Sequence, residues 1–568
     1  MKAMLCFLLI AVCAAGAQEM EESTERDNGG VDDAVLLSEE LDYYRENPIS
    51  LESATFEDLS ALPFLSPILA RKILDFRDER GIQTMGDLLL IPGFDERVMR
   101  RLANYVTFEP SEGQKSRYSD FLSHTQGAFR SRINSSAAGA PLSSSSRVRL
   151  SSSSMDAGVS YLRTEGNSEA KTDGYLRWCA GDQLPSIIAG DFAVYAGQGL
   201  VFAGSSRSGK SGLPDQVRGR GSPIAPRLSL SDPLTQRGIA LKEDFRLGRF
   251  LFFRSTGYTG GNCEIHSEGV TFGGSILRPL DRNVPVSAGT NAEILTGGFD
   301  FFGEVAGNST ATLSSVAGFL YSPEPSIEVA ARVQRYSLQY ENPLAHPFSE
   351  SGSGEPGEQG RSLGIAVHPL HCLKLSLVAG AFEYVPASSF AVNGREYVLR
   401  TEILLARKSR MTMYVRRKEI SDGISEGKSQ TNVRLTLLNG FDLPLELSER
   451  IEYTIVRSAK ETGREKGILL FTDAAIRLAE ERVVLKARMI VFQTDGYESR
   501  LYEYEESVRG ASAVPPLYGR GLRWYILAEC GVISGILFSA RYAETVSWNQ
   551  GISRTLPRQV TFQAEAVF

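Results

Sequence analysis

The feature that most constrains this chain is a two-residue alternation of apolar and polar side chains. It is clearest in the ten residues from Gln559 to Phe568. One face there carries Val560, Phe562, Ala564, Ala566 and Phe568, and the other carries Thr561, Gln563, Glu565 and Val567. A period of two predicts a β-strand, and ten residues are enough for a tilted strand to cross a membrane.

The same alternation recurs upstream, in residues 326–334, 482–492 and 522–529. In each stretch the charged residues share one face, as a barrel wall with lipid outside and a polar lumen inside requires. A soluble β-sandwich array would also alternate, but residues 121–568 show none of the internal repeats that such a long array should contain. The pattern therefore predicts a mainly β fold, a large antiparallel transmembrane barrel of about eighteen strands.

Two further features of residues 121–568 fit a barrel. Long polar inserts at 205–232 and 349–361 predict long loops at one end and short turns at the other. Aromatic residues near the predicted strand ends are candidates for interface girdles, namely Tyr195, Tyr336, Tyr340, Trp524 and Trp548.

The last strand, ending on Phe568, resembles the closing strand of bacterial outer-membrane β-barrels. This resemblance implies that Phe568 is an assembly signal for the barrel-assembly machinery and that outer-membrane lipid surrounds the barrel. Loss of Phe568 is then expected to lower the amount of assembled protein in the outer membrane.

The N-terminal part predicts export. Residues 1–17 carry one lysine, an apolar run and Ala15-Gly16-Ala17, which is the pattern of a cleaved signal peptide. Residues 18–46 hold eleven acidic and two basic residues and predict a disordered acidic leader. No later run of eighteen apolar residues predicts a membrane helix. The cysteines after residue 17 are too scattered to predict a disulfide framework.

Residues 47–108 predict a small all-α domain. Thr55 and Asp58 can cap a short helix, Pro67 suits the first turn of the next helix, and Gly81 suits its end. The unit then repeats, with a short helix framed by Thr84 and Asp87 and a last helix over residues 96–105. Residues 109–120 form a polar linker to the barrel.

This repeat resembles the tandem helix-hairpin-helix module of ComEA-type competence proteins, through its ALPFLSP and LIPGFDE turns. The resemblance implies binding to the phosphates of double-stranded DNA, with backbone N–H groups at a helix N-terminus approaching the phosphate. Transferred to this chain, the DNA-binding residues are Ser66, Arg71, Lys72, Gly93, Arg97, Arg100 and Arg101.

The hairpins also depart from that family. Phe64 and Ser66 stand where the first hairpin should have glycines, and Asp95 replaces a glycine in the second, where an acid would repel phosphate. Residues 47–108 contain seven basic and nine acidic residues, whereas DNA-binding domains normally have a basic face. A docking or scaffold role for the module is the alternative.

Two motifs, GDF…GQGLV at 190–201 and RLYEYE…GRG at 500–521, resemble segments of large envelope proteins that join such a module to a barrel-like region. Residues 204–211 match the phosphate-binding pattern G-x-x-x-x-G-K-S. That pattern needs a following helix, and Pro214 and several glycines argue against one. No metal, cofactor or catalytic site is predicted, and the zinc-protease motif H-E-x-x-H is absent from the sequence.

The sequence therefore predicts a non-enzymatic barrel of the bacterial outer membrane with a periplasmic helix-hairpin-helix module. Two functions are open. In the first, the module binds DNA or the barrel passes it. In the second, the module binds a periplasmic protein or plugs the barrel, and no DNA is involved.

Overall fold

The computed structural model describes residues 41–108 and 126–568 apart from short gaps. The gaps are 42, 46–47, 63–64, 92–93, 95, 137–141, 153, 168–169, 180–184, 205–211, 220, 229–231, 233, 310–311, 325, 346–347, 351–356, 386–390, 407–408, 422–426, 442–443, 459–462, 480–481, 512, 534, 550–551 and 556–557. The predicted signal peptide, the linker at 109–120 and most of the acidic leader lie outside the described residues. No helix in the described part is both long and apolar enough to cross a membrane.

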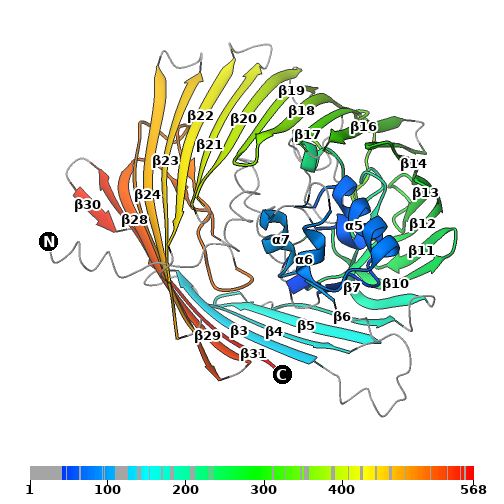
Figure 1. The fold of residues 1–568 in the computed structure, drawn as a ribbon, viewed down its shortest axis with the longest axis horizontal. Helices are drawn as coiled ribbons and strands as arrows, with labels where there is room; N and C mark the ends of the chain where they lie inside the picture. Colours follow the sequence, from blue (N-terminus) through cyan, green and yellow to red (C-terminus); the bar gives the residue numbers. More distant parts are fainter. Residues whose placement is uncertain are drawn as a thin grey trace.

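The chain forms one closed ring of antiparallel strands around a filled lumen (Figure 1). Every strand of the ring pairs with its neighbours along the chain, and β31 pairs with β3 to close it. The ring strands are β3 (Gln126–Ser136), β4 (Ser143–Ser151), β5 (Met155–Thr164), β6 (Lys171–Cys179), β7 (Ser186–Ala196), β10 (Gln236–Phe245), β11 (Gly248–Ser255), β12 (Tyr258–Ser267), β13 (Val270–Pro279), β14 (Ser287–Thr296), β15 (Phe299–Asn308), β16 (Leu313–Glu324), β17 (Ile327–Arg335), β18 (Glu358–Leu370), β19 (Leu373–Tyr384), β20 (Val392–Ala406), β21 (Ser409–Ser421), β22 (Lys428–Gly440), β23 (Leu445–Ser458), β24 (Arg464–Leu478), β25 (Val483–Thr494), β28 (Arg520–Ile533), β29 (Ile536–Asn549) and β31 (Gln559–Val567).

The ring has 24 strands, so the sequence-based count of about eighteen is wrong. Strands such as β12 and β14 are rich in glycine, serine, threonine and asparagine and show little apolar alternation. The turns that follow them, residues 268–269 and 297–298, carry no long insert to separate one strand from the next. Pairing with neighbours, rather than the local sequence pattern, makes these segments strands.

The expected alternation is confirmed across the wall. On β17, Ala330, Arg332 and Gln334 are buried, whereas Val333 between them is 57% exposed. On the closing strand, Gln563 and Glu565 are buried and Phe562 is 57% exposed. On these strands the outer face is apolar and the inner face is polar.

The two ends of the barrel differ as predicted. At the end where β3 begins and β31 finishes, neighbouring strands are joined by short turns. Three long connections leave the opposite end, over residues 197–235, 336–357 and 495–519. They contain β8 (Phe202–Ala203), η1 (Pro214–Gln216), β9 (Ile224–Pro226), β26 (Leu501–Tyr502) and β27 (Pro516–Leu517). The remaining short strand, β30 (Ile552–Thr555), pairs with β29 outside the ring.

Phe568 lies at the seam where the barrel closes. Its backbone N–H donates to the carbonyl oxygen of Gly127 at 2.9 Å, and the N–H of Gly127 donates back at 2.6 Å. A Cβ atom on Gly127 would lie 2.3 Å from the Phe568 ring, so only glycine leaves room for the ring there. The role of Phe568 as an assembly signal stays a prediction.

The N-terminal module contains α4 (Phe56–Ser60), α5 (Pro67–Arg80), α6 (Met85–Leu88) and α7 (Glu96–Leu102). The Thr55–Asp58 cap forms, Pro67 begins α5, and Gly81 follows its last residue. A feature not predicted is the parallel pairing of β1 (Ile49–Ser50) with β2 (Val106–Thr107), which joins the two ends of the module.

The girdle prediction is wrong for three of its five aromatic residues. Tyr336 and Tyr340 are buried in an apolar cluster inside the barrel, and the Tyr195 hydroxyl donates to the carbonyl oxygen of Gly197 on an inward loop. Trp524 and Trp548 lie on the outer face, as expected of girdle residues. The pattern missed the difference because long loops that fold inward carry aromatics of their own.

Candidate functional site: the filled lumen

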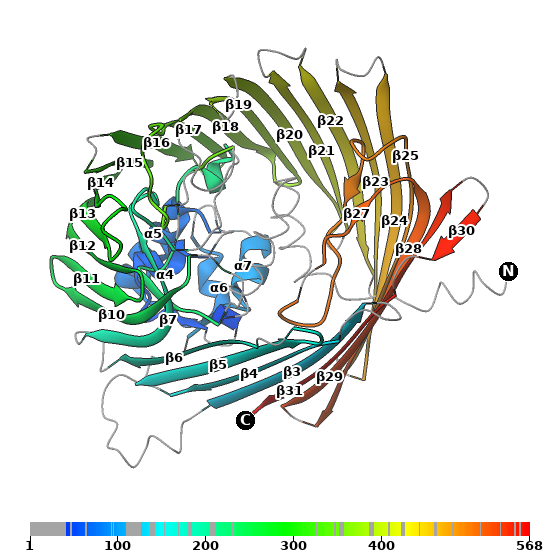
Figure 2. The same cartoon turned by 180° about the vertical axis from the view of Figure 1, so that it is seen from behind.

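The helical module lies inside the ring, on the side of β5 to β16, in both views (Figures 1 and 2). Tyr43 accepts a hydrogen bond from the Arg177 guanidinium on β6 at 3.1 Å. The Arg149 guanidinium on β4 lies 4.9 Å from the centre of the Tyr43 ring. Burial raises the pKa of Tyr43, so its hydroxyl stays protonated at neutral pH.

Apolar packing also holds the module to the wall. Ile68, in the first turn of α5, is 8% exposed and belongs to the cluster that includes Phe192 of β7 and Phe253 of β11. The Arg218 guanidinium, on the connection between β7 and β10, lies 6.0 Å from the centre of the Phe56 ring. The module is therefore a packed part of the barrel interior.

The GDF…GQGLV motif anchors the first inward loop, residues 197–235. Asp191 accepts hydrogen bonds from Arg237 of β10 at 2.7 Å and from the backbone N–H of Gly174 at 2.6 Å. Glu304 of β15 accepts from the N–H groups of Gln198 and Leu200. Gly197 permits this, because it has φ +60° and a Cβ there would lie 2.8 Å from the Glu304 carboxylate.

The second inward loop, residues 336–357, packs on the first. The Tyr340 hydroxyl donates to the carbonyl oxygen of Leu200 at 2.7 Å, and the Asn342 side chain donates to the same oxygen at 3.1 Å. At its far end, Ser349 donates to Glu358 at 2.6 Å. These two loops and the module fill the same side of the lumen.

The third connection, residues 495–519, is called the strap. It crosses the inner face of β23 to β29, opposite the module, and carries β26 and β27 (Figure 2). Its RLYEYE motif supplies two buried carboxylates, Glu503 and Glu505, and the next residue, Glu506, supplies a third. Leu501 and Leu517 pack against Leu469, Phe471, Ile490 and Phe492 of the wall. The sequence alone assigns this motif no role.

Glu503 and Glu505 meet arginines of the wall. Glu503 pairs with Arg450 at 2.9 Å, and Glu505 pairs with Arg523 and Arg541 at 2.5 Å each. Burial raises the pKa of Glu503 to about 7 despite Arg450 beside it. The pKa of Glu505 is lowered, because its two arginines outweigh the effect of burial.

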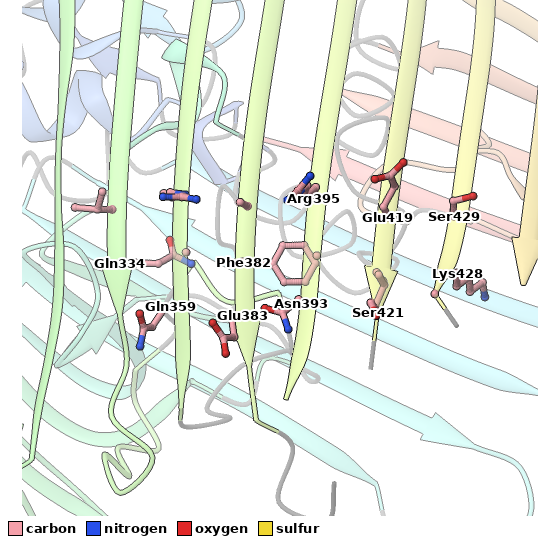
Figure 3. Close-up of a pocket in the computed structure, with 17 residues that line it drawn as sticks. Gln334, Gln359, Phe382, Glu383, Asn393, Arg395, Glu419, Ser421, Lys428 and Ser429 are labelled. Atoms are coloured by element: carbon pink, nitrogen blue, oxygen red, sulfur yellow. The ribbon is translucent and has the colours of Figure 1, made fainter. Parts of the chain in front are cut away.

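A cavity of about 910 Å³ lies at the long-loop end of β17 to β22 (Figure 3). Its lining includes Gln334, Phe382, Arg395, Glu419 and Lys428. Lys428 forms an ion pair with Glu498 of the strap, and Lys418 nearby pairs with Glu350 of the second inward loop. The cavity is therefore lined by the wall and lies between the strap and the second inward loop.

The residues predicted to bind DNA are only partly described. Ser66 caps α5, because its hydroxyl accepts from the N–H of Leu69 at 3.2 Å. Arg71 pairs with Asp75 at 2.9 Å on the exposed side of α5, and Lys72 lies one position further along the helix. Arg97, Arg100 and Arg101 lie on α7; Gly93 and the side chains of Arg97 and Arg100 lie outside the described part. Their role stays a prediction.

The sequence predicts neither a nucleotide site nor a metal site. The P-loop-like residues 205–211 lie outside the described residues, and the first helical element after them is the short 3₁₀ turn η1. Within the described part of the chain, no group of His, Cys, Asp and Glu side chains has the arrangement of a metal site. Cys179, Cys263, Cys372 and Cys530 are free thiols.

A comparison with family models found a match to the module, and a comparison with solved structures found barrels similar to this one. Residues 45–107 match the family model described as "Helix-hairpin-helix motif". No curated protein sequence matches the chain. Among solved structures, the chain is similar to the ferric enterobactin receptor of Pseudomonas aeruginosa (9% identity, TM-score 0.43) and the siderophore receptor PirA of Acinetobacter baumannii (10%, 0.43). Each alignment covers 78% of this chain and 80% of the other.

A copper transporter, OprC, is similar to the same degree, at 8% identity and a TM-score of 0.45 over 78% of this chain and 80% of that one. At this level the likeness is one of barrel architecture. The chain's own strand pairing defines a closed 24-stranded antiparallel barrel. It encloses a helix-hairpin-helix module of its own.

Proposed function

We propose that the protein is a non-enzymatic outer-membrane barrel whose own helix-hairpin-helix module closes the lumen, so that passage requires the module to move. The observation that carries this proposal is the docking of the module on the inner wall, through Tyr43 and Ile68. A barrel of this many strands would otherwise enclose an aqueous channel, because diameter grows with strand number.

The proposed location rests on the outer face of the wall. Large apolar side chains there are exposed along successive strands, for example Phe250, Phe272, Leu377 and Phe538. A belt of this kind would aggregate in water and is stable in lipid. The end of the barrel from which β3 begins is then periplasmic, and the three inward loops start from the outer surface.

Conductance across a planar lipid bilayer tests closure. The full-length protein is expected to give little current, and a variant lacking residues 18–108 is expected to give large, stable openings. Ile68→Asp should open the full-length barrel part of the time, because it puts a charge into the apolar cluster between module and wall. Leu90→Asp is the matched control, since Leu90 is 67% exposed.

Equal conductance of the full-length and deleted proteins would contradict the proposal. Heat-modifiable gel mobility of each variant shows separately that its barrel has assembled. A variant that fails to assemble is therefore not counted as a closed one.

DNA is the second candidate for what the module engages, because residues 45–107 match the helix-hairpin-helix family. The first turn of α5, where a phosphate would sit, has its Ser66 hydroxyl occupied and Ile68 buried against the wall. DNA binding would therefore require the module to leave the wall. The full-length Ile68→Asp variant should then bind duplex DNA more tightly than the parent protein.

A titration of fluorescent duplex DNA at two salt concentrations tests this candidate. Affinity that falls steeply with salt supports phosphate contacts, and Ala at Arg97, Arg100 and Arg101 together should remove it. If the Ile68→Asp variant does not bind DNA at low salt, DNA is not the module's ligand, and closure of the lumen remains its proposed role.

A further inference from the structure

The lumen wall from β20 to β29, part of which lies under the strap, concentrates arginine. Seven strands each place one buried arginine on the inner face. These residues are Arg400 on β20, Arg416 on β21, Arg434 on β22, Arg450 on β23, Arg488 on β25, Arg523 on β28 and Arg541 on β29. The whole chain has a formal net charge of −7, so this band is not a consequence of composition.

Four of these arginines pair with carboxylates of the wall itself. Arg400 pairs with Glu402, Arg416 with Glu396, Arg434 with Glu452, and Arg488 with Asp473. In each case the acid is on the same strand or the next one along the ring. These pairs would persist if the strap moved.

Arg488 also approaches the strap, with its guanidinium 3.9 Å from Glu503 and donating to the carbonyl oxygen of Tyr504. The other three arginines have their carboxylate partners on the strap. Arg450 meets Glu503, and Arg523 and Arg541 both meet Glu505. Glu503 and Glu505 have no exposed surface. Removal of the strap would therefore leave three guanidinium groups facing the lumen without these carboxylates.

The fit of Glu503 in this site is incomplete. Its Oε2 atom accepts from Arg450, whereas its buried Oε1 atom has no hydrogen-bond partner among the described residues. A buried carboxyl oxygen without a hydrogen-bond partner is unfavourable. The strap therefore loses no hydrogen bond at this oxygen when an anionic ligand displaces Glu503.

We propose that Arg450, Arg523 and Arg541 form a binding site for a multivalent anionic solute, and that Glu503 and Glu505 of the strap occupy this site in the closed barrel. This inference rests on the proposed closure and names the substrate class. The planar guanidinium fork matches phosphate and carboxylate groups alike. The ligand carries at least two such groups, spaced like residues i and i+2 of an extended chain, roughly 7 Å apart.

Competition with a tethered strap selects for multivalency. Both ends of the strap join barrel strands, so its carboxylates are present at a high effective concentration. A single anion that replaces one carboxylate leaves the other in place. A ligand that replaces both can release the strap and remain bound to the three arginines.

The test measures binding to the full-length protein in lipid nanodiscs, with tripolyphosphate and citrate as probes in separate titrations. The double variant Glu503→Gln, Glu505→Gln removes both strap carboxylates without changing side-chain size. Its affinity for at least one probe is expected to rise tenfold or more over the parent. The matched control is Glu243→Gln with Glu268→Gln, which removes the same charge from exposed positions and should leave affinity unchanged.

Adding Arg523→Ala and Arg541→Ala to the double variant should abolish the gain, and the corresponding lysine substitutions should retain part of it. Tighter binding of both probes indicates a site for either anionic group, and tighter binding of tripolyphosphate alone indicates phosphate. Unchanged affinity in the double variant, or a gain that survives loss of both arginines, would overturn the site. That result would leave closure by the module intact, since conductance tests it independently.

Discussion

The two sides of the lumen are filled in different ways. On the module side, aromatic and aliphatic side chains such as Ile68, Phe192 and Phe253 form one apolar cluster between module, loops and wall. On the strap side, carboxylates of the strap meet arginines of the wall. Strands are also shorter on the module side, at 8 to 12 residues for β3 to β17, against 12 to 15 for β18 to β29.

This difference determines which side of the lumen can respond to solutes and pH. Apolar burial depends on the area removed from water and changes little with pH or charged ligands. Buried ion pairs add little net stability, but breaking one partner is strongly unfavourable. The module side is thus a steady closure, and the strap side is sensitive to charge.

The largest expected effect comes from Glu505→Gln, because it leaves Arg523 and Arg541 without their shared carboxylate. Breaking a buried pair in this way costs about 3–5 kcal/mol. The strap should then be cut by trypsin at Arg500 or Arg509 far faster than in the parent. Glu419→Gln, at an exposed ion pair with Arg417, should leave the cutting rate unchanged.

Ile68→Ala should weaken the module side by about 2 kcal/mol, through lost burial and the cavity left behind. Hydrogen exchange of α5 in the full-length protein is expected to accelerate, while the strap keeps its protection. Leu90→Ala, at a site that is 67% exposed, should change exchange little. Loss of protection in the strap as well would show that the two sides are not independent.

The pH response should separate the two sides. Docking raises the pKa of Glu503 to about 7 from 4.5, so between these values the docked strap holds a proton that the released strap has lost. Docking therefore weakens as pH rises through this window, by about tenfold for each unit of pKa difference. Arg450, Arg434, Arg488 and Glu452 are the charged groups around Glu503.

Hydrogen exchange of the strap, corrected for intrinsic rates, measures this response. Protection should fall between pH 5 and pH 8 in the parent and fall less in Glu503→Gln, where the pKa of Glu506 is still raised by burial. Glu505 acts in the opposite direction at lower pH, because its pKa is lowered and its contribution is lost on acidification. A strap whose protection rises with pH across the window would contradict the assignment to Glu503.

Tyr43→Phe should have the smallest effect. It removes the hydrogen bond from Arg177 and keeps the ring beside Arg149, so a loss of about 1 kcal/mol in module docking is expected. The effect should be the same from pH 5 to pH 8, because the raised pKa of Tyr43 keeps it protonated throughout. Hydrogen exchange of the backbone N–H groups of Tyr43 and its neighbours in the full-length protein measures both the loss of docking and its independence of pH.

Local sequence signals predicted the local structures well. The cap of α4 at Thr55, the start of α5 at Pro67 and its end before Gly81 are confirmed, because each depends on residues within a few positions. The inward and outward faces of β17 and β31 are confirmed for the same reason, since alternation is a property of each strand alone.

The number of strands, the inward course of the loops and the placement of the module could not be predicted in this way. Nothing near Glu505 in the chain indicates that Arg523 and Arg541 will surround it. Likewise, Ile68 and Phe253 are far apart in the sequence and share one cluster only in the closed ring. Three tyrosines predicted for the girdles lie inside the barrel, because contacts between residues far apart in the sequence decide whether a long loop folds inward.

The chain's alternation of apolar and polar residues was sufficient to specify a barrel with an apolar outside, because each strand must hide its polar face from lipid. What fills that barrel depended on tertiary structure. Ring closure brings β4, β6 and β7 around the module and β23 to β29 around the strap. Burial then determines which charges must be paired, since an unpaired charge is unfavourable only once water is excluded.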